Sequence, residues 1–255
     1  MIKRNKMKHM IRNGEVAYGV LVALPSPVLI EMSALAGFDF VIIDQEHGAI
    51  SPETLENMVR AAEATEISPL VRIRDSQPES ILAALDRGAQ GVVVPHMKNA
   101  EQASEVTRAC RFYPEGNRGM AAAGRSSGFG TVPPSEFFAT ANEETFLMPM
   151  IEDQEGVEKI DQILAIEGID AILAGAGDLA QAYGVPGQPS HPRIQEIVAK
   201  IFAASQKAGV PFCAIVKDSQ GAKGWKERGA KCFLTGDDQR IIFAAFKNLI
   251  SSIRG

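Results

Sequence analysis

The sequence predicts a (β/α)8 barrel, also called a TIM barrel, with an N-terminal helix, formed by a single domain over residues 1–255. Eight short apolar segments recur along the chain, and the spacing between them leaves room for a helix. Several segments are continuously apolar, which is typical of parallel strands buried on both faces. A glycine repeatedly ends a helical pattern just before the next strand. A chain of this length suits one such barrel, and a doubly wound open sheet is the alternative.

Each element is placed by its own pattern. The eight predicted strands cover residues 17–24, 38–47, 68–74, 88–97, 145–152, 168–178, 211–218 and 231–238. Helical patterns cover residues 1–14, 51–65, 76–88, 99–112, 155–168 and 191–209. Ser51 followed by Pro52 is a typical helix start, and Asn13-Gly14 is a typical helix end. Residues 111–144 form the longest connection, which we expect to be a functional or intersubunit loop.

Composition narrows the classes of partner. The chain has 26 basic and 31 acidic residues and a net charge of -5, which argues against general nucleic-acid binding. No apolar stretch has the length of a membrane span, and no secretory signal follows the basic N-terminus. Cys110, Cys213 and Cys232 are widely spaced, so we expect buried thiols in a reducing cytoplasm rather than disulfides or a thiolate zinc site. A small-molecule partner is therefore expected.

Acidic side chains stand where catalytic groups gather in such barrels, at the carboxyl ends of strands. Glu152 ends the fifth predicted strand and Asp178 the sixth. Carboxylates on adjacent strands supply the oxygen ligands that Mg²⁺, Mn²⁺ or Co²⁺ prefer. Open coordination positions could take the keto and carboxylate oxygens of a 2-oxo acid, with the metal as Lewis acid toward an enolate. Alternatively, these carboxylates merely cap the next helix, as Asp178 before LAQAYG could.

Histidine and arginine occur at neighbouring strand ends. His47 follows Asp44 and Glu46, and a neutral imidazole beside carboxylates suits general-base chemistry, although a structural role is also common. Arg72 lies inside the apolar run PLVRIR, where burial requires an anionic partner. That partner is either the substrate or its developing oxyanion, or a core ion pair with Asp44 or Glu46. His96 also stands at a strand end.

The ordered motifs of the chain carry a resemblance. AGFDFVIIDQEH, PLVRIR, LDRGAQGVVVPHMKNAEQA, RFYPEGNRG, MIEDQEG and LAGAGDLAQAYG together resemble those of the class II pyruvate aldolases of the HpcH/HpaI group, over most of the chain. The resemblance implies a carbon–carbon lyase that reversibly cleaves a 4-hydroxy-2-oxo acid to pyruvate, or a related 2-oxo acid, and an aldehyde. It also implies dependence on a divalent metal and assembly as a homohexamer with active sites at subunit contacts.

The resemblance also implies residue roles. Glu152 and Asp178 would hold the metal, His47 would be the catalytic base, and Arg72 would stabilise the enolate oxygen. The backbone of Gly177 and Asp178 would contact the substrate carboxylate.

Asp86 is implied to raise the basicity of the active histidine. Because Asp86 precedes the fourth strand, it should lie near the opposite rim of its own barrel, so it could reach His47 only across a subunit contact or through an unusual helix placement.

Three departures from the family pattern leave substrate preference open. The usual Gly-Pro-Ala-Asp is here Gly-Ala-Gly-Asp at residues 175–178, Met150 replaces a substrate-contacting glutamine, and His96 stands where a hydrophobic residue is usual. Losing an amide and gaining an imidazole changes which polar groups the pocket can satisfy.

Three other functions compete with a metal-dependent aldolase. Lys217, at the end of the seventh predicted strand, could form a Schiff base if burial lowered its pKa. The same metal site could serve a decarboxylase acting on oxaloacetate. A barrel that only binds a ligand or acts as a scaffold is the non-enzymatic alternative.

Overall fold

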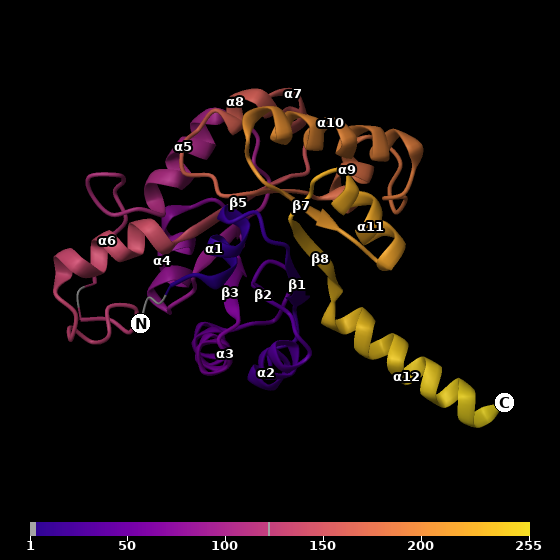
Figure 1. The fold of residues 1–255 in the computed structure, drawn as a ribbon, viewed down its shortest axis with the longest axis horizontal. Coiled ribbons are helices and arrows are strands. Elements are labelled where there is room, and N and C mark those ends of the chain that lie inside the picture. Colours follow the sequence, from indigo (N-terminus) through magenta and orange to yellow (C-terminus); the bar gives the residue numbers. More distant parts are fainter. Residues whose placement is uncertain (1–3, 122) are drawn as a thin grey trace.

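Eight parallel strands form a closed barrel in the computed structural model, which describes residues 4–121 and 123–255 (Figure 1). Strands pair in chain order, and β1 pairs with β8 to close the sheet. The strands are β1 Ala17–Val22, β2 Phe40–Asp44, β3 Ser68–Arg72, β4 Gly91–Val94, β5 Phe146–Ile151, β6 Ile172–Ala174, β7 Phe212–Ile215 and β8 Cys232–Asp237. The predicted barrel is confirmed, and closure excludes the open sheet.

Helices surround the barrel. They are α1 Lys6–Arg12, α2 Pro27–Leu35, α3 Pro52–Thr65, α4 Pro78–Asp86, α5 Ala100–Ala109, α6 Pro134–Glu144, α7 Gln154–Glu158, α8 Ile160–Leu164, α9 Ala176–Ala182, α10 Pro192–Ala208, α11 Ser219–Glu227 and α12 Asp238–Arg254. The Ser51 hydroxyl accepts the Thr54 N–H at 3.1 Å, which confirms the predicted start of α3. The long connection was expected to be a loop as far as Glu144, but α6 occupies its last part because Pro134 begins a new helix.

Side chains alternate between two apolar layers along the strands. Phe40 and Ile42 of β2 belong to the cluster inside the barrel, whereas Val41 and Ile43 pack in the layer between strands and helices. The continuous burial of β2 explains its unbroken apolar sequence. This period of two determines which polar residues enter the barrel where the strands end.

The helix α1 closes the end of the barrel at which the strands begin. Met7 and Ile11 pack into the interior cluster. Lys8 is buried beside them, and its ammonium donates to the Thr145 carbonyl at 2.7 Å and lies 2.9 Å from Asp170. Burial lowers the pKa of Lys8, and the charge of Asp170 opposes that effect. The predicted N-terminal helix is thus an integral part of the core.

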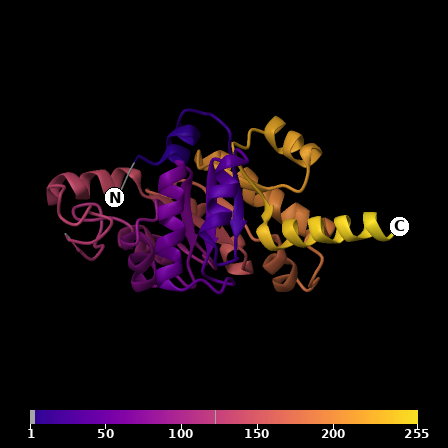
Figure 2. The same ribbon diagram turned by 90° about the horizontal axis from the view of Figure 1, so that it is seen from below.

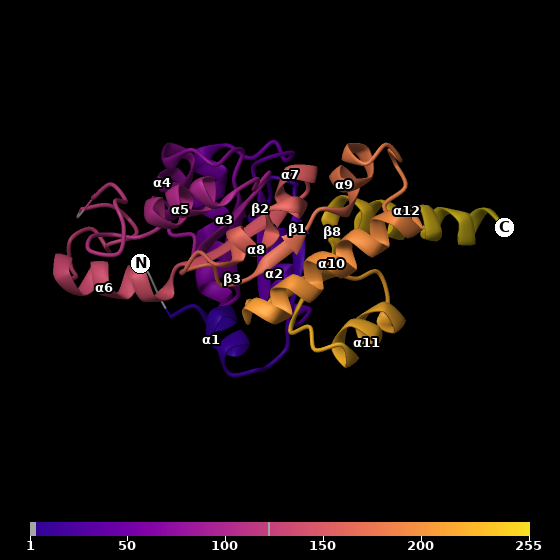
Figure 3. The ribbon, with the colours of Figure 1, turned by 90° about the horizontal axis from the view of Figure 1, so that it is seen from above.

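The last helix, α12, leaves the body of the molecule at the end of β8. Figure 2 and Figure 3 show it extending outward, on the side of the molecule opposite to α6. Within the described part of the chain, none of the helices combines the length and hydrophobicity needed to cross a membrane.

Candidate active site

The alternation of side chains places three charged residues at the end of the barrel where the strands finish. Asp44 continues the inward series of Phe40 and Ile42, and Arg72 is its register partner on β3. Glu152 directly follows β5 and continues the inward series of that strand. Residues far apart in the sequence therefore meet at one rim.

Asp44 organises the rim. Its carboxylate accepts two hydrogen bonds from Arg72, from Nε at 2.9 Å and from Nη2 at 2.7 Å. The same carboxylate accepts the backbone N–H groups of Glu46 at 3.0 Å and His47 at 3.4 Å. Asp44 thus fixes both the guanidinium and the turn that carries the candidate base.

Arg72 forms the core ion pair that the sequence left open. Its Nε also lies 3.2 Å from Glu46 Oε2. Burial by itself lowers the pKa of Arg72, but the hydrogen bond and charge of Asp44, with the charge of Glu46, outweigh it and raise the pKa. The guanidinium is therefore a fixed cation facing the site.

Glu152 is a buried carboxylate, with a side chain only 2% exposed. Its Oε1 accepts the backbone N–H of His96 at 2.8 Å. Burial raises its pKa; the His96 interactions oppose this, and the charges of Asp178 and Glu46 raise the pKa further. A buried anion of this kind is suited to a bound cation.

Gly175 makes room for that carboxylate. A Cβ at Gly175, just after β6, would lie 2.3 Å from Glu152 Oε2 and 2.8 Å from its Cβ. A side chain at this position would therefore displace Glu152.

His96 brings an imidazole to the carboxylates. Its backbone is left-handed, with φ of 53°. Its Nδ1 lies 3.1 Å from Asp153 Oδ2, and its Nε2 lies 3.9 Å from Glu46 Oε1. Glu46, His96 and Glu152 each present one ligand atom within 4.8 Å of the others, which we call the rim triad. Oxygen and nitrogen donors so close together could hold a divalent metal.

Asp178 lies beside the rim triad rather than within it. The residue is exposed in the first turn of α9, and its charge contributes to the raised pKa of Glu152. A carboxylate in a first helical turn is also favourable without any metal. The two predicted ligands, Glu152 and Asp178, are thus close enough for their charges to interact, and their metal role stays a prediction.

The other predicted site residues differ in how deeply they are buried. The His47 side chain is 70% exposed, and its Nε2 lies 3.9 Å from Glu46 Oε2. Met150 is buried in the barrel interior, one inward position before Glu152, so its side chain lies beneath the carboxylates. Gly177 is exposed, and a Cβ there would meet nothing within 4 Å. Open space thus adjoins the α9 end of the site.

Asp86 faces a different partner. It ends α4, and its Oδ1 accepts a hydrogen bond of 2.9 Å from Nη2 of the buried Arg118. Because α4 leads into the start of β4, Asp86 belongs to the opposite rim from His47. Its predicted effect on His47 therefore needs a second subunit and remains a prediction.

Neither Lys217 nor the three cysteines lie in surroundings that favour a nucleophile. Lys217 is exposed beyond β7, whereas the Schiff-base alternative required a buried lysine. The cysteines are buried as expected, and burial raises the pKa of Cys110 to about 11 and that of Cys232 well above its usual value.

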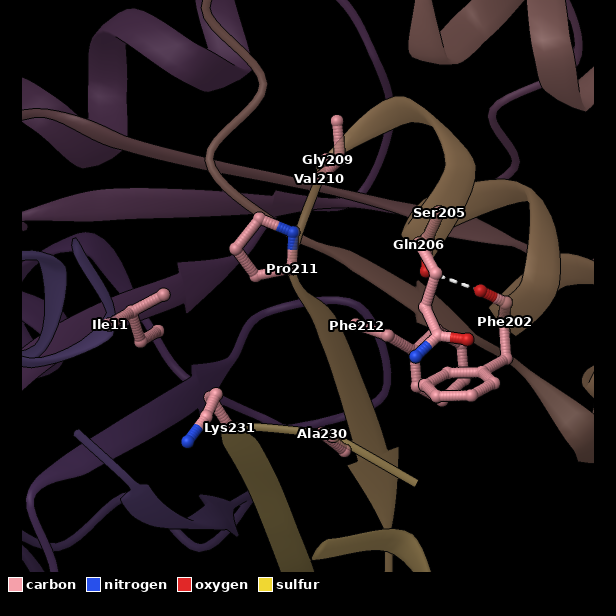
Figure 4. A pocket seen from close by; sticks show the side chains of 11 residues that line it. Ile11, Phe202, Ser205, Gln206, Gly209, Val210, Pro211, Phe212, Ala230 and Lys231 are labelled. Carbon is pink, nitrogen blue, oxygen red and sulfur yellow. Dashed lines mark hydrogen bonds between the residues drawn. The ribbon is translucent and has the colours of Figure 1, made fainter. Parts of the chain in front are cut away.

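A pocket at the opposite end of the barrel does not offer comparable chemistry. It lies where β7 and β8 begin and is lined by Phe202, Pro211, Phe212 and Lys231, among others (Figure 4). The Ser205 hydroxyl beside it already donates to the Phe202 carbonyl. Catalytic groups of barrels collect at the other end, so the rim triad is the stronger candidate.

The sequence pointed less clearly to three supporting residues. Glu46 was considered as a neighbour of His47 and as an ion-pair partner of Arg72 but not as a metal ligand, Asp153 was not paired with His96, and Gly175 was seen only as part of a motif. The DQEH turn signals Glu46, because two acids two residues apart can both face the barrel mouth. The Asp153 and Gly175 contacts depend on neighbouring strand ends and leave no local signal.

Comparisons with known proteins identify relatives of the chain. The HpcH/HpaI aldolase/citrate lyase family matches residues 17–245. A 5-keto-4-deoxy-D-glucarate aldolase of Klebsiella pneumoniae subsp. pneumoniae is 33% identical over 250 residues, which cover 98% of this chain and 97% of the relative.

Solved structures extend the comparison. The citrate synthase SbnG superposes with a TM-score of 0.91 at 35% identity over 98% of each chain. An HpcH/HpaI family protein from Burkholderia cenocepacia J2315 has a TM-score of 0.92 at 28% identity, covering 98% of this chain and 100% of the other. The predicted enzyme class, a carbon–carbon lyase, is confirmed by the family match. The chain belongs to the HpcH/HpaI aldolase/citrate lyase family.

Proposed function

We propose that the protein is a divalent-metal-dependent aldolase that reversibly cleaves a 4-hydroxy-2-oxo acid to pyruvate, or a related 2-oxo acid, and an aldehyde. The observation that carries this proposal is the buried Glu152 carboxylate, which faces Glu46 and His96 at the rim where the strands end. The aldolase name of a relative aligned over almost the whole chain supports the same reaction.

The donor set fits a divalent metal. Glu152 and Asp178 would hold the ion as predicted, and carboxylate oxygens suit Mg²⁺, Mn²⁺ or Co²⁺. When bound, the ion would supply Lewis-acid polarisation of the 2-oxo group. The raised pKa of Glu152 supports the fit, because a nearby cation would offset the cost of its buried charge.

The residues of the chain supply orientation and proton transfer. Exposed at the rim, His47 would remove the proton from the C4 hydroxyl, so that the C3–C4 bond breaks and the aldehyde leaves. The electron pair of that bond would remain as the enolate, which is then protonated at C3 to give the 2-oxo acid. Arg72, fixed by Asp44, would stabilise the developing enolate oxygen. Backbone groups of Gly177 and Asp178 would contact the substrate carboxylate, and Asp86 of a second copy would raise the basicity of His47.

Met150 bears on specificity. Its thioether lies among the interior side chains beneath Glu152 and adds no strong hydrogen-bonding group where the family has an amide. We propose that it lines the floor of the substrate site and that the pocket prefers a 2-oxo acid needing fewer polar contacts there.

Aldol addition is the assay that tests the reaction. Pyruvate and hydroxypyruvate are each incubated with a panel of aldehydes, with and without a chelator, and the products are identified. We expect chelation to abolish turnover and added Mn²⁺, Mg²⁺ or Co²⁺ to restore it. Glu152→Gln should lower kcat by about 100- to 1,000-fold, because the developing enolate charge would lose its stabilisation. Full activity in a folded Glu152→Gln protein would refute the proposal.

Three further assays distinguish the alternative functions. Inactivation by borohydride with pyruvate, unaffected by chelation, would indicate a Schiff base on Lys217. Carbon dioxide release from oxaloacetate without aldehyde would indicate a decarboxylase. Because one similar structure is a citrate synthase, citrate formation from oxaloacetate and an acetyl donor is measured in parallel.

We also propose that the protein works in the cytoplasm as a homo-oligomer, a hexamer by resemblance. The three buried free cysteines suit a reducing compartment. Large apolar side chains on α12 and on α2 remain exposed in the single chain, and such patches are typical of protein interfaces. Sedimentation equilibrium over a range of concentrations tests this, and a monomer at every concentration would contradict it.

A further inference from the structure

We infer that His96 is a nitrogen ligand of the proposed metal site, oriented by Asp153, and that it makes the site favour Co²⁺ and Ni²⁺ over Mg²⁺. This inference rests on the proposed metal-dependent function. It concerns a residue that the predicted pair of Glu152 and Asp178 does not include.

The orientation of the imidazole is the first argument. Nδ1 of His96 lies 3.1 Å from Asp153 Oδ2, within hydrogen-bonding distance. If Nδ1–H donates to that carboxylate, the tautomer leaves a lone pair on Nε2, the other ring nitrogen. Histidines that bind metals commonly donate their second N–H to a carboxylate in this way.

The spacing of the donors is the second argument. Nε2 of His96 lies 3.9 Å from Glu46 Oε1, which is too long for a hydrogen bond. Two donors bonded at about 2.1 Å to one ion lie from about 3 Å apart at right angles to about 4.2 Å apart on opposite sides. The spacing of Nε2 and Glu46 Oε1 falls within that interval. Glu152 adds the third ligand atom of the rim triad, whose atoms lie within 4.8 Å of one another, so only small side-chain shifts would bring all three onto one ion.

The backbone supports the same assignment. The left-handed φ of 53° at His96 costs about 1 kcal/mol for a residue with a Cβ. This conformation directs the His96 N–H to Glu152 at 2.8 Å, so one residue positions the buried carboxylate and carries the imidazole beside it. The His96 side chain is half exposed, so an ion and its remaining ligands can reach the ring from solvent.

Ion preference follows from ligand chemistry. Mg²⁺ binds oxygen ligands and keeps much of its water, so an imidazole adds little to its affinity. Imidazole strengthens the binding of Co²⁺ and Ni²⁺, which stand above the weaker-binding divalent ions for nitrogen-containing sites. His96 therefore distinguishes between ions that Glu152 and Asp178 alone would bind with less discrimination.

Metal binding itself tests the inference. Protein stripped with a chelator and dialysed is titrated with Co²⁺, Ni²⁺ and Mg²⁺ by calorimetry. The test variant is His96→Asn, because asparagine tolerates the left-handed backbone and keeps the N–H that Glu152 accepts. We expect its Kd for Co²⁺ and Ni²⁺ to rise about 10- to 100-fold and its Kd for Mg²⁺ to change less than about threefold.

Two further variants define the mechanism. Asp153→Asn should weaken Co²⁺ binding less than His96→Asn does, because the ring loses its charged partner but keeps its donor. His191→Gln is the matched control, since the His191 ring nitrogen accepts the Arg193 N–H at the start of α10. Its affinity for each ion should equal that of the unaltered protein.

A spectroscopic signature gives a second readout. Imidazole bound to Co²⁺ produces a paramagnetically shifted ring N–H resonance, which should disappear in His96→Asn. Unchanged Co²⁺ affinity in His96→Asn, equal losses for Co²⁺ and Mg²⁺, or an unchanged spectrum would overturn the role of His96. If His96→Asn does not fold, His96→Gly provides the same comparison, because glycine also adopts the left-handed backbone.

Failure of the proposed function can be distinguished from failure of the inference about His96. Glu152→Gln should weaken binding of all three ions, whatever His96 does. If the unaltered protein binds none of the ions, both the metal-dependent function and the role of His96 fail. Loss of binding in Glu152→Gln with no effect in His96→Asn would refute the inference alone.

Discussion

The buried charge of Glu152 adds little to the stability of the metal-free protein. The carboxylate is buried, and its pKa is raised by burial and by the neighbouring charges of Asp178 and Glu46. We expect Glu152→Gln, which keeps the shape and removes the charge, to stabilise the chelated protein by about 1 kcal/mol. That change corresponds to a rise in Tm of about 2–4 °C for a chain of this size.

Thermal unfolding in a chelator at neutral pH measures this effect. Glu105→Gln, at an exposed position on α5, is the control and should leave the Tm unchanged. A lower Tm for Glu152→Gln would mean that the carboxylate stabilises the fold even without metal, against the burial argument.

Gly175 supports Glu152 from the neighbouring strand. A methyl group there would lie 2.3 Å from Glu152 Oε2, and the side chain of Glu152 can yield more easily than the backbone. We expect Gly175→Ala to lower kcat/KM for aldol cleavage at least about tenfold while the circular dichroism spectrum is retained. Gly224→Ala on α11 meets nothing within 4 Å, so equal losses in both variants would remove the specific role of Gly175.

For single residues, the sequence predicted which side chains belong to the site better than it predicted their contacts. Arg72 was expected to have an anionic partner because it interrupts an apolar strand, and the structure supplies Asp44 and Glu46. The contact of Asp153 with His96 was not predictable, since it depends on the ends of two different strands. Strand periodicity tells which face a side chain occupies, but not which side chain meets it there.

Among the elements, α1 depends on a charged contact with α6. Glu144, at the end of α6, accepts the backbone N–H of Asn5 at 2.6 Å and lies 3.0 Å from His9 Nε2. Burial raises the pKa of Glu144, but the Asn5 hydrogen bond and His9 outweigh burial and lower it. A carboxyl group whose pKa is lowered by folding stabilises the protein above its unfolded pKa of about 4.5. That stability is lost as the pH falls through the lowered value.

Glu144→Gln tests this linkage. We expect the variant to lose about 1–2 kcal/mol of unfolding free energy at pH 7, and the two proteins to converge as the pH falls below about 4. Urea unfolding at pH 7, 5, 4 and about 3 measures the difference, and the lowest pH samples the range in which the lowered pKa predicts convergence. Glu143→Gln, the exposed neighbour, should follow the unaltered protein at each pH. A constant difference across the range would show that ionisation of Glu144 is not the cause.

Local sequence patterns predicted a helix correctly where typical capping residues mark its start. Ser51 and Pro52 marked the start of α3 correctly. The helix α6 was missed because a long polar connection hid it, although Pro134 and the apolar Phe137 and Phe138 offered a signal. The pattern at 155–168 became two short helices, α7 and α8, that break at Lys159. The sequence thus predicts that a helix is present more reliably than it predicts whether the helix is unbroken.

For the whole molecule, the succession of eight βα units favoured a closed barrel, but it left the open sheet as an alternative until the pairing of β1 with β8 excluded it. The position of α12 was not predictable in the same way. An amphipathic helix after the last strand is expected to cover its own barrel, yet α12 projects outward (Figure 1). The amphipathic pattern of α12 predicts that one of its faces packs on an apolar surface, but it does not tell whether that surface belongs to the same chain or to another copy.

Self-association would bury the exposed apolar face of α12. Phe243 and Phe246 of α12 are 70% and 67% exposed, and α2 exposes Val28, Met32 and Leu35 at helical spacing. We expect α12 of one copy to pack on α2 of another, because each surface lacks a cover in the single chain. The Tm of the protein should then rise with concentration, since association stabilises only folded chains.

Charges on the apolar face should abolish the effect. Phe243→Glu combined with Phe246→Glu should yield a smaller species by sedimentation and a Tm independent of concentration. Asn248→Glu, on the opposite face of α12, is the control and should assemble normally. If the double variant keeps its assembly state, α12 does not form the contact. If assembly is lost together with the predicted cleavage activity, the rim needs a neighbouring subunit, as the predicted role of Asp86 toward His47 implies.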